Sequence, residues 1–154
     1  MLKCDILIVG SGPAGSSAGF EAVKPGAKVI IIEKKKEIGN PVQCAEFIPK
    51  LLWSKLDISS DSIVQEVKKM RIYFPDGKFS EVDAPGYMLN RRIFDKQLAI
   101  KAINKGVGIL TNTKCISREK GIIIAEKESK QLKINTKIII GADGPKSTVG
   151  RWIG

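Results

Sequence analysis

The sequence of 154 residues predicts an α/β fold in which a buried parallel sheet is interrupted by an antiparallel excursion. Two observations predict it. The stretches 5–9 and 138–140 are short, continuous apolar runs without the alternation of a half-exposed strand, as in parallel strands covered on both faces. Each run ends abruptly in a glycine-rich turn, one near each end of the chain.

The first elements form a βαβ unit. After the strand 5–9 comes a turn of sequence Gly-Ser-Gly-Pro-Ala-Gly, and small residues through Gly19 then indicate a helix packed close to the sheet. Pro25-Gly26 closes this segment. Residues 28–32 form a second buried strand that ends in Glu33. Strand, turn, helix and strand in this order make one βαβ unit.

The glycine turn and Glu33 together predict a Rossmann-like adenine dinucleotide site. Gly10 permits a tight turn, Gly12 lets backbone N–H groups approach a pyrophosphate, and Gly15 allows close packing of helix and strand. The helix N-terminus favours the anion through its dipole. Glu33, at the end of the second strand, would accept hydrogen bonds from the adenosine ribose. The alternative is a structural turn followed by a solvated glutamate.

The middle of the chain departs from the βαβ pattern. A polar stretch indicates a loop, and a Pro-Asp-Gly turn indicates a hairpin. Farther on, apolar residues at every fourth position indicate a helix that ends at Gly106. The expected elements are a loop at 34–43, a short helix at 49–56, a hairpin of strands 67–74 and 78–82, a third strand at 87–89, and a helix at 92–104.

The remainder predicts five strands, at 107–110, 114–117, 121–125, 131–134 and 137–140. The middle three are polar-edged and separated by tight turns, which indicates a small antiparallel meander. The last is a fully buried parallel strand that ends in Gly141-Ala142-Asp143-Gly144. Because ligands lie outside the carboxyl ends of such strands, this second turn brings the chain back to the dinucleotide, where Asp143 can bond ribityl or ribose hydroxyls.

Composition excludes several classes of site. The chain has no histidine, and so lacks the commonest general base and any Ser-His or Cys-His catalytic pair. Its three cysteines are far apart and form no C-x-x-C pair, which argues against a disulfide framework or a zinc site. Any chemistry is therefore expected to depend on a bound cofactor.

Charge and hydropathy bear on partners and location. The net charge of +10 favours anionic partners such as phosphates or an acidic membrane surface, although it also fits the Lys-rich composition of a hot or salty habitat. No nucleic-acid-binding signature accompanies it. No apolar run approaches the ~20 residues of a membrane span, and residues 1–5 leave no room for a signal peptide. We expect a cytoplasmic protein.

The excursion after Glu33 favours FAD over NAD, because an NAD-binding domain would continue with regular βαβ units. The two glycine turns and Glu33 resemble the flavoproteins built on the p-hydroxybenzoate hydroxylase fold. Within that group, the stretches 38–46 and 87–98 resemble the geranylgeranyl reductase family, and residues 150–154 fit its continuation. The archaeal digeranylgeranylglycerophospholipid reductases are the most similar members, and the resemblance covers the whole chain.

The resemblance implies which residues contact FAD. Phe47 stands where family members usually carry glycine, and Arg91 is otherwise a surface cation at a helix start. Cys44 is either a structural thiol or a catalytic residue that shapes the site and handles a proton beside the flavin. The cofactor-binding residues expected from the motifs and the resemblance together are Gly10, Gly12, Pro13, Ala14, Gly15, Glu33, Lys34, Cys44, Ala45, Phe47, Arg91, Cys115 (through backbone nearby) and Asp143; no metal site is expected.

The implied activity is the saturation of isoprenoid double bonds of an archaeal-type ether phospholipid, with protonation accompanying hydride delivery from reduced flavin. The partners would be that lipid, a reduced electron donor and a peripheral contact with the inner membrane face. Residues 1–154 would be the N-terminal part of the FAD-binding domain (4–33, 34–90 and 91–154), with the fold incomplete and the substrate domain absent. The alternatives are a flavin monooxygenase of the same fold and a truncated, non-catalytic dinucleotide-binding module.

Overall fold

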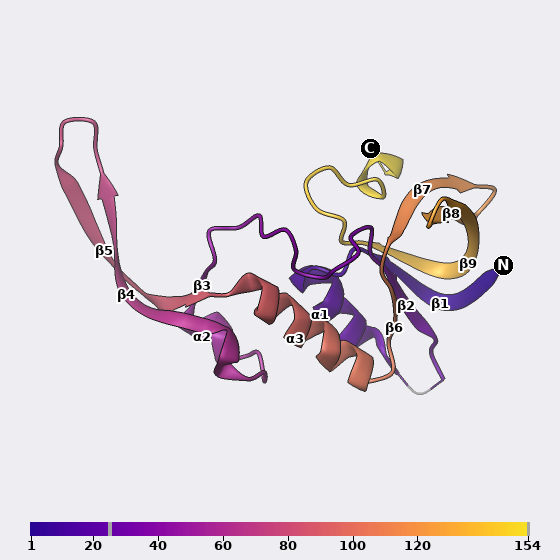
Figure 1. The fold of residues 1–154 in the computed structure, drawn as a ribbon, viewed down its shortest axis with the longest axis horizontal. Helices are drawn as coiled ribbons and strands as arrows, with labels where there is room; N and C mark the ends of the chain where they lie inside the picture. Colours follow the sequence, from indigo (N-terminus) through magenta and orange to yellow (C-terminus); the bar gives the residue numbers. More distant parts are fainter. Residues whose placement is uncertain (25, 154) are drawn as a thin grey trace. The chain divides into compact units, whose positions relative to one another are not determined.

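A computed structural model describes residues 1–24 and 26–153 of the chain (Figure 1). Pro25, which was expected to close the first helical segment, and Gly154 lie outside the described residues. Contacts group the chain into two compact units, one of Met1–Asn40 with Asp95–Gly154 and one of Pro41–Phe94. Each unit is described by itself.

The first unit is built on a six-stranded sheet of order β6-β2-β1-β9-β8-β7. The central strand β1 pairs in parallel with β2 and β9, and β2 pairs in parallel with β6. The remaining pairs, β9 with β8 and β8 with β7, are antiparallel and form the predicted meander. The elements are β1 (Leu2–Val9), α1 (Pro13–Ala22), β2 (Val29–Ile32), β6 (Gly108–Leu110), β7 (Thr113–Glu119), β8 (Ile122–Lys127) and β9 (Lys130–Gly141).

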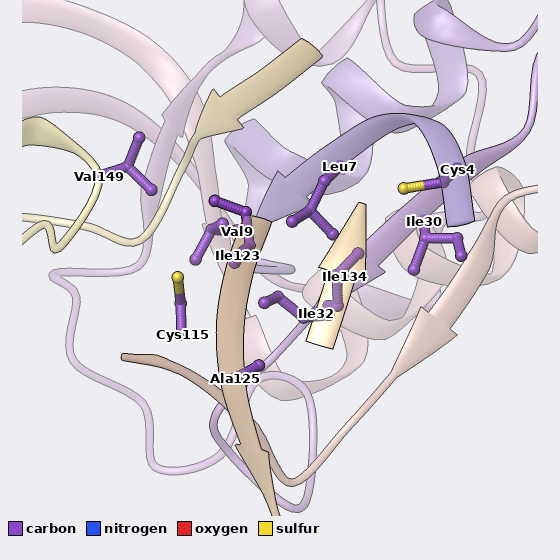
Figure 2. Close-up of a cluster of buried hydrophobic side chains, with 10 residues drawn as sticks. All are labelled: Cys4, Leu7, Val9, Ile30, Ile32, Cys115, Ile123, Ala125, Ile134 and Val149. Carbon is purple, nitrogen blue, oxygen red and sulfur yellow. The ribbon is translucent and has the colours of Figure 1, made fainter. Parts of the chain in front are cut away.

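Both faces of β1 and β2 are covered, and successive side chains of each strand point to opposite faces. On one face, Leu7 and Ile32 pack with the meander residue Ile123, in a cluster shown in Figure 2. On the other face, Ile8 and Ile31 pack with residues of α1 and α3. All five side chains are at most 1% exposed. The continuous apolar pattern of the first strands is thereby explained.

The strand β9 corrects the sequence-based assignment of two strands at 131–134 and 137–140. Its first half pairs antiparallel with β8, and Asn135 and Thr136 already pair in parallel with β1, so no turn interrupts it. The expectation that its last run is fully buried is also wrong. Ile138 is 53% exposed and Ile139 and Ile140 are only half-buried; β8 pairs with β9 no further than Asn135, so β1 is the one strand that pairs with this run among the described residues.

The second unit holds a three-stranded antiparallel sheet of order β3-β5-β4. The predicted strands at 78–82 and 87–89 are one strand, β5, which contains a bulge: Ala84 and Pro85 lie opposite the single β4 residue between Val67 and Lys69. The predicted helix at 49–56 shrinks to one turn. The elements are β3 (Phe47–Pro49, not predicted), α2 (Lys50–Trp53), the 3₁₀ turn η1 (Ser60–Ser62), β4 (Ile63–Tyr73) and β5 (Phe79–Leu89).

The helix α3 (Arg91–Asn104) begins in the second unit and continues into the first. The side-chain Oδ1 of Asn90 accepts hydrogen bonds from the backbone N–H groups of Arg92 and Ile93, which caps the helix. The predicted stripe is confirmed, since every one of its apolar residues (Phe94, Leu98, Ala102) is at most 6% exposed. Gly106, with φ +105°, ends the helical segment as predicted.

Candidate dinucleotide-binding site

The glycine turn between β1 and α1 depends on two glycines for steric reasons. Gly10 has φ +101°, and a Cβ there would lie 2.3 Å from the carbonyl oxygen of Ala142. A Cβ on Gly15 would lie 1.8 Å from the carbonyl oxygen of Gly10. Neither position accepts a larger residue without a backbone shift, so the motif is required by the packing of this turn.

The N-terminus of α1 fits an anionic ligand. Gly12 is the N-cap residue and Pro13 follows at the first helical position, and no side chain in the described part of the chain caps this helix. A Cβ on Gly12 would meet no described atom within 4 Å, so the space in front of the helix is open. The first turn carries no acidic residue. Backbone N–H groups and the helix dipole therefore face this space, as a pyrophosphate requires.

Glu33 is bound to the glycine turn. Its side chain is 8% exposed, and its Oε2 accepts hydrogen bonds from the backbone N–H (2.8 Å) and the hydroxyl (3.1 Å) of Ser11. Its Oε1 accepts one from the backbone N–H of Lys35 at 2.9 Å. A buried carboxylate needs such partners, and these three hold it at the carboxyl end of β2 beside the turn.

The second glycine turn lies against the first, as predicted. Gly141 pairs with Val9, and the backbone N–H of Ala142 donates to the carbonyl of Val9 at 2.8 Å. The Asp143 carboxylate accepts bonds from the hydroxyl of Ser147 and from two backbone N–H groups just beyond it. Burial raises the pKa of Asp143, but these hydrogen bonds outweigh it and hold the pKa below its ordinary value. Its predicted bond to the cofactor stays a prediction.

Cys115 and Lys34 lie on the meander side of Glu33. Cys115 is 6% exposed and points into the cluster of Figure 2. Burial, and secondarily the charge of Asp143, raises the pKa of this thiol to about 11, so the side chain is an inert packing group. The predicted contact of the backbone near Cys115 with FAD stays a prediction. Lys34 borders a cavity of about 580 Å³ whose other lining residues are Asn112, Lys114, Glu126, Glu128 and Ser129.

The other four predicted residues, Cys44, Ala45, Phe47 and Arg91, lie in the second unit. Cys44 and Ala45 are exposed, and the Cys44 Sγ accepts a weak hydrogen bond from the backbone N–H of Glu46 at 3.4 Å. Phe47 opposes Met88 in β5, and the Arg91 guanidinium lies 5.6 Å from the ring centre of Phe94.

Glu46 lies among the residues predicted to contact FAD, although sequence reasoning did not single it out. It adopts φ 65°, which is unusual for a residue with a side chain. Its carbonyl accepts a bond from Leu89 N–H at 2.8 Å, and its Oε1 lies 3.5 Å from the Arg91 backbone nitrogen. It thereby links Cys44 to the start of α3. The left-handed backbone conformation of Glu46 could not be predicted from the sequence, because that conformation is normally predicted only where Gly or Asn stands.

Comparisons with known proteins agree with this geometry. A sequence model described as FAD dependent oxidoreductase matches residues 5–144. The digeranylgeranylglycerophospholipid reductase of Methanothrix thermoacetophila is 40% identical over 99% of the chain, and reductase 2 of Methanosphaera stadtmanae is 38% identical over 100%. The chain spans 42% of the length of each of these relatives.

Solved structures show the same fold. A geranylgeranyl bacteriochlorophyll reductase-like protein from Thermoplasma acidophilum is similar over 100% of this chain and 42% of its own, with 36% identity and a TM-score of 0.85. A myxobacterial chondrochloren halogenase, described as a variant of FAD-dependent halogenases, has a TM-score of 0.74 at 15% identity and shows the fold alone. The predicted fold class, the predicted preference for FAD over NAD and the resemblance to geranylgeranyl reductases are therefore confirmed. Because the family match covers residues 5–144, the chain belongs to the FAD-dependent oxidoreductase family.

Proposed function

We propose that this chain is the FAD-binding part of a reductase that saturates isoprenoid double bonds of archaeal-type ether phospholipids. The observation that carries the proposal is its identity of 36–40% to curated proteins named digeranylgeranylglycerophospholipid reductase, over nearly its whole length. The open space before the uncapped α1 and the oriented Glu33 supply a matching cofactor site.

The first unit supplies the binding part of this function. The backbone N–H groups of Gly12, Ala14 and Gly15 hold the two phosphates, and Glu33 accepts a hydrogen bond from the adenosine ribose. The turn at Ala142-Asp143 closes the other side of the glycine turn. When FAD is bound, it supplies the hydride chemistry that the side chains of this chain cannot perform.

Cys44 is the proposed proton-handling residue. An isolated alkene cannot stabilise the negative charge left by hydride addition, so saturation also requires a proton at the neighbouring carbon. Cys44 is the exposed one of the three free cysteines, whereas Cys4 and Cys115 are buried. Its Sγ would hold a proton for the alkene carbon and recover it from solvent. Contact of the whole protein with a lipid surface is part of the same proposal.

A chimera tests the proposal. The matching segment of the Methanothrix reductase is replaced by this chain, and the purified chimera is incubated with a chemical reductant and digeranylgeranylglycerophospholipid. Mass spectrometry is expected to show two hydrogen atoms added per double bond, with turnover at least tenfold lower for Cys44→Ser. Turnover unchanged by Cys44→Ser removes the thiol from the chemistry. An FAD-loaded chimera that leaves the lipid unchanged contradicts the assigned substrate, and a hydroxylated product favours a monooxygenase.

A further inference from the structure

We infer that Ser11 is a positioning residue that orients the Glu33 carboxylate for one ribose hydroxyl of the dinucleotide. The inference rests on the proposed binding of FAD at this turn. Ser11 lies between two glycines of the motif and is 1% exposed. Its side chain therefore faces the protein, although the motif itself requires no particular residue at that position.

Both donors of Ser11 converge on one carboxylate oxygen. The backbone N–H and the hydroxyl donate to Glu33 Oε2 at 2.8 and 3.1 Å. The Lys35 backbone N–H donates to Oε1 at 2.9 Å. An ionised carboxylate has about four lone-pair sites, so these three bonds leave about one, on Oε1. That remaining site accepts one hydroxyl, and the Ser11 bonds fix its direction.

A second buried serine holds Ser11 itself. The Ser16 hydroxyl, on the first turns of α1, donates to the Ser11 carbonyl at 2.9 Å, and Ser16 is fully buried. The helix that receives the phosphates is thus connected through two serines to the carboxylate that receives the ribose. The turn aligns two parts of one ligand, the diphosphate and the adenosine sugar.

Removing the Ser11 hydroxyl is expected to lower the affinity only for ligands that contain adenosine. Ser11→Ala keeps the backbone bond and removes the hydroxyl bond to a charged group, which is expected to weaken FAD binding about tenfold. FMN lacks the adenosine half and does not reach Glu33, so its affinity is expected to change by less than about twofold. A change confined to overall folding would not separate these two ligands.

The test measures dissociation constants of FAD and FMN by flavin fluorescence, with the purified 154-residue chain. Ser117→Ala is the matched control, because it removes a serine–glutamate hydrogen bond of 3.1 Å on the exposed meander. Ser11→Cys, with similar volume and a weak S–H donor, serves if Ser11→Ala does not fold. In a Glu33→Gln background, adding Ser11→Ala is expected to weaken FAD binding by less than about twofold.

The outcomes separate the inference from the function it rests on. The role of Ser11 is supported if Ser11→Ala binds FAD about tenfold more weakly and FMN unchanged, while Ser117→Ala binds both ligands like wild type. Equal affinities of wild type and Ser11→Ala for FAD, or equal losses for FAD and FMN, overturn it while leaving the cofactor site in place. A wild-type chain that takes up no FAD overturns the proposed cofactor site, and this inference with it.

Discussion

At the scale of single residues, the three glycines of the first turn have different structural roles. Gly10 makes room for the backbone of Ala142 in the second turn and Gly15 for the carbonyl of Gly10, whereas Gly12 faces open space. Sequence patterning predicted all three, because the motif spacing is fixed by the geometry of a strand, a tight turn and a helix. It did not predict the roles of Ser11 or Glu46, since one depends on a buried hydrogen bond and the other on an unusual backbone angle.

A pair of alanine substitutions separates folding from binding. Gly15→Ala places a Cβ against the Gly10 carbonyl, so we expect it to lower the free energy of unfolding by about 3 kcal/mol, at the upper end of overpacking costs. Gly12→Ala meets no described atom within 4 Å at a φ of −65°, and is expected to change that free energy by less than about 1 kcal/mol. Urea denaturation measures both.

Gly12→Ala, which is expected to change stability little, is expected to have a large effect on FAD affinity. The methyl group of Gly12→Ala projects into the space proposed for the diphosphate, so FAD affinity is expected to fall at least tenfold in a protein that is otherwise stable. A Gly12→Ala chain that binds FAD as tightly as wild type would place the phosphates elsewhere.

At the scale of elements, the patterns predicted which segments are strands better than where strands end. The βαβ unit, α3 and the meander follow from runs of apolar residues and turn glycines. The sequence-based prediction divided two strands wrongly, β5 at Pro85-Gly86 and β9 at the polar stretch before Ile138, because both stretches are typical of the end of a strand. Both strands continue because partner strands supply hydrogen bonds there, and pairing between distant segments leaves no local signal.

The hairpin of β4 and β5 has one apolar and one charged face. Opposed residues of an antiparallel pair share a face, and Met70 opposes Val82, followed by Ile72 two residues along. All three are 43–49% exposed. On the other face, Glu81 accepts bonds from Lys69 and Arg71.

Substitution on the apolar face is expected to leave stability intact. Ile72→Thr removes a half-exposed methyl-bearing side chain and is expected to change the free energy of unfolding by less than about 0.5 kcal/mol, while self-association measured by light scattering decreases. The matched control, Ile31→Thr, introduces a hydroxyl at a fully buried position and is expected to cost about 3 kcal/mol. Equal losses for the two variants would show that the hairpin face is covered in solution.

At the scale of the whole molecule, the predicted site residues fall into two groups, one in each compact unit. The first unit brings together the glycine turn, Glu33 and the Asp143 turn, and the second joins Cys44 to the start of α3 through Glu46. Among the described residues, none of the helices has the length and hydropathy of a membrane-spanning helix. The excess of cations, a net charge of +10, favours association with an anionic dinucleotide.

The most direct test of the account is a titration of the purified chain with FAD, followed by displacement with ADP, which carries both phosphates and the ribose but no flavin. We expect saturable binding of one FAD per chain, competition by ADP, and binding that weakens as the salt concentration rises. Binding that ADP cannot displace, or the absence of saturable binding under conditions where the chain is folded, would contradict the placement of the diphosphate at the first turn of α1.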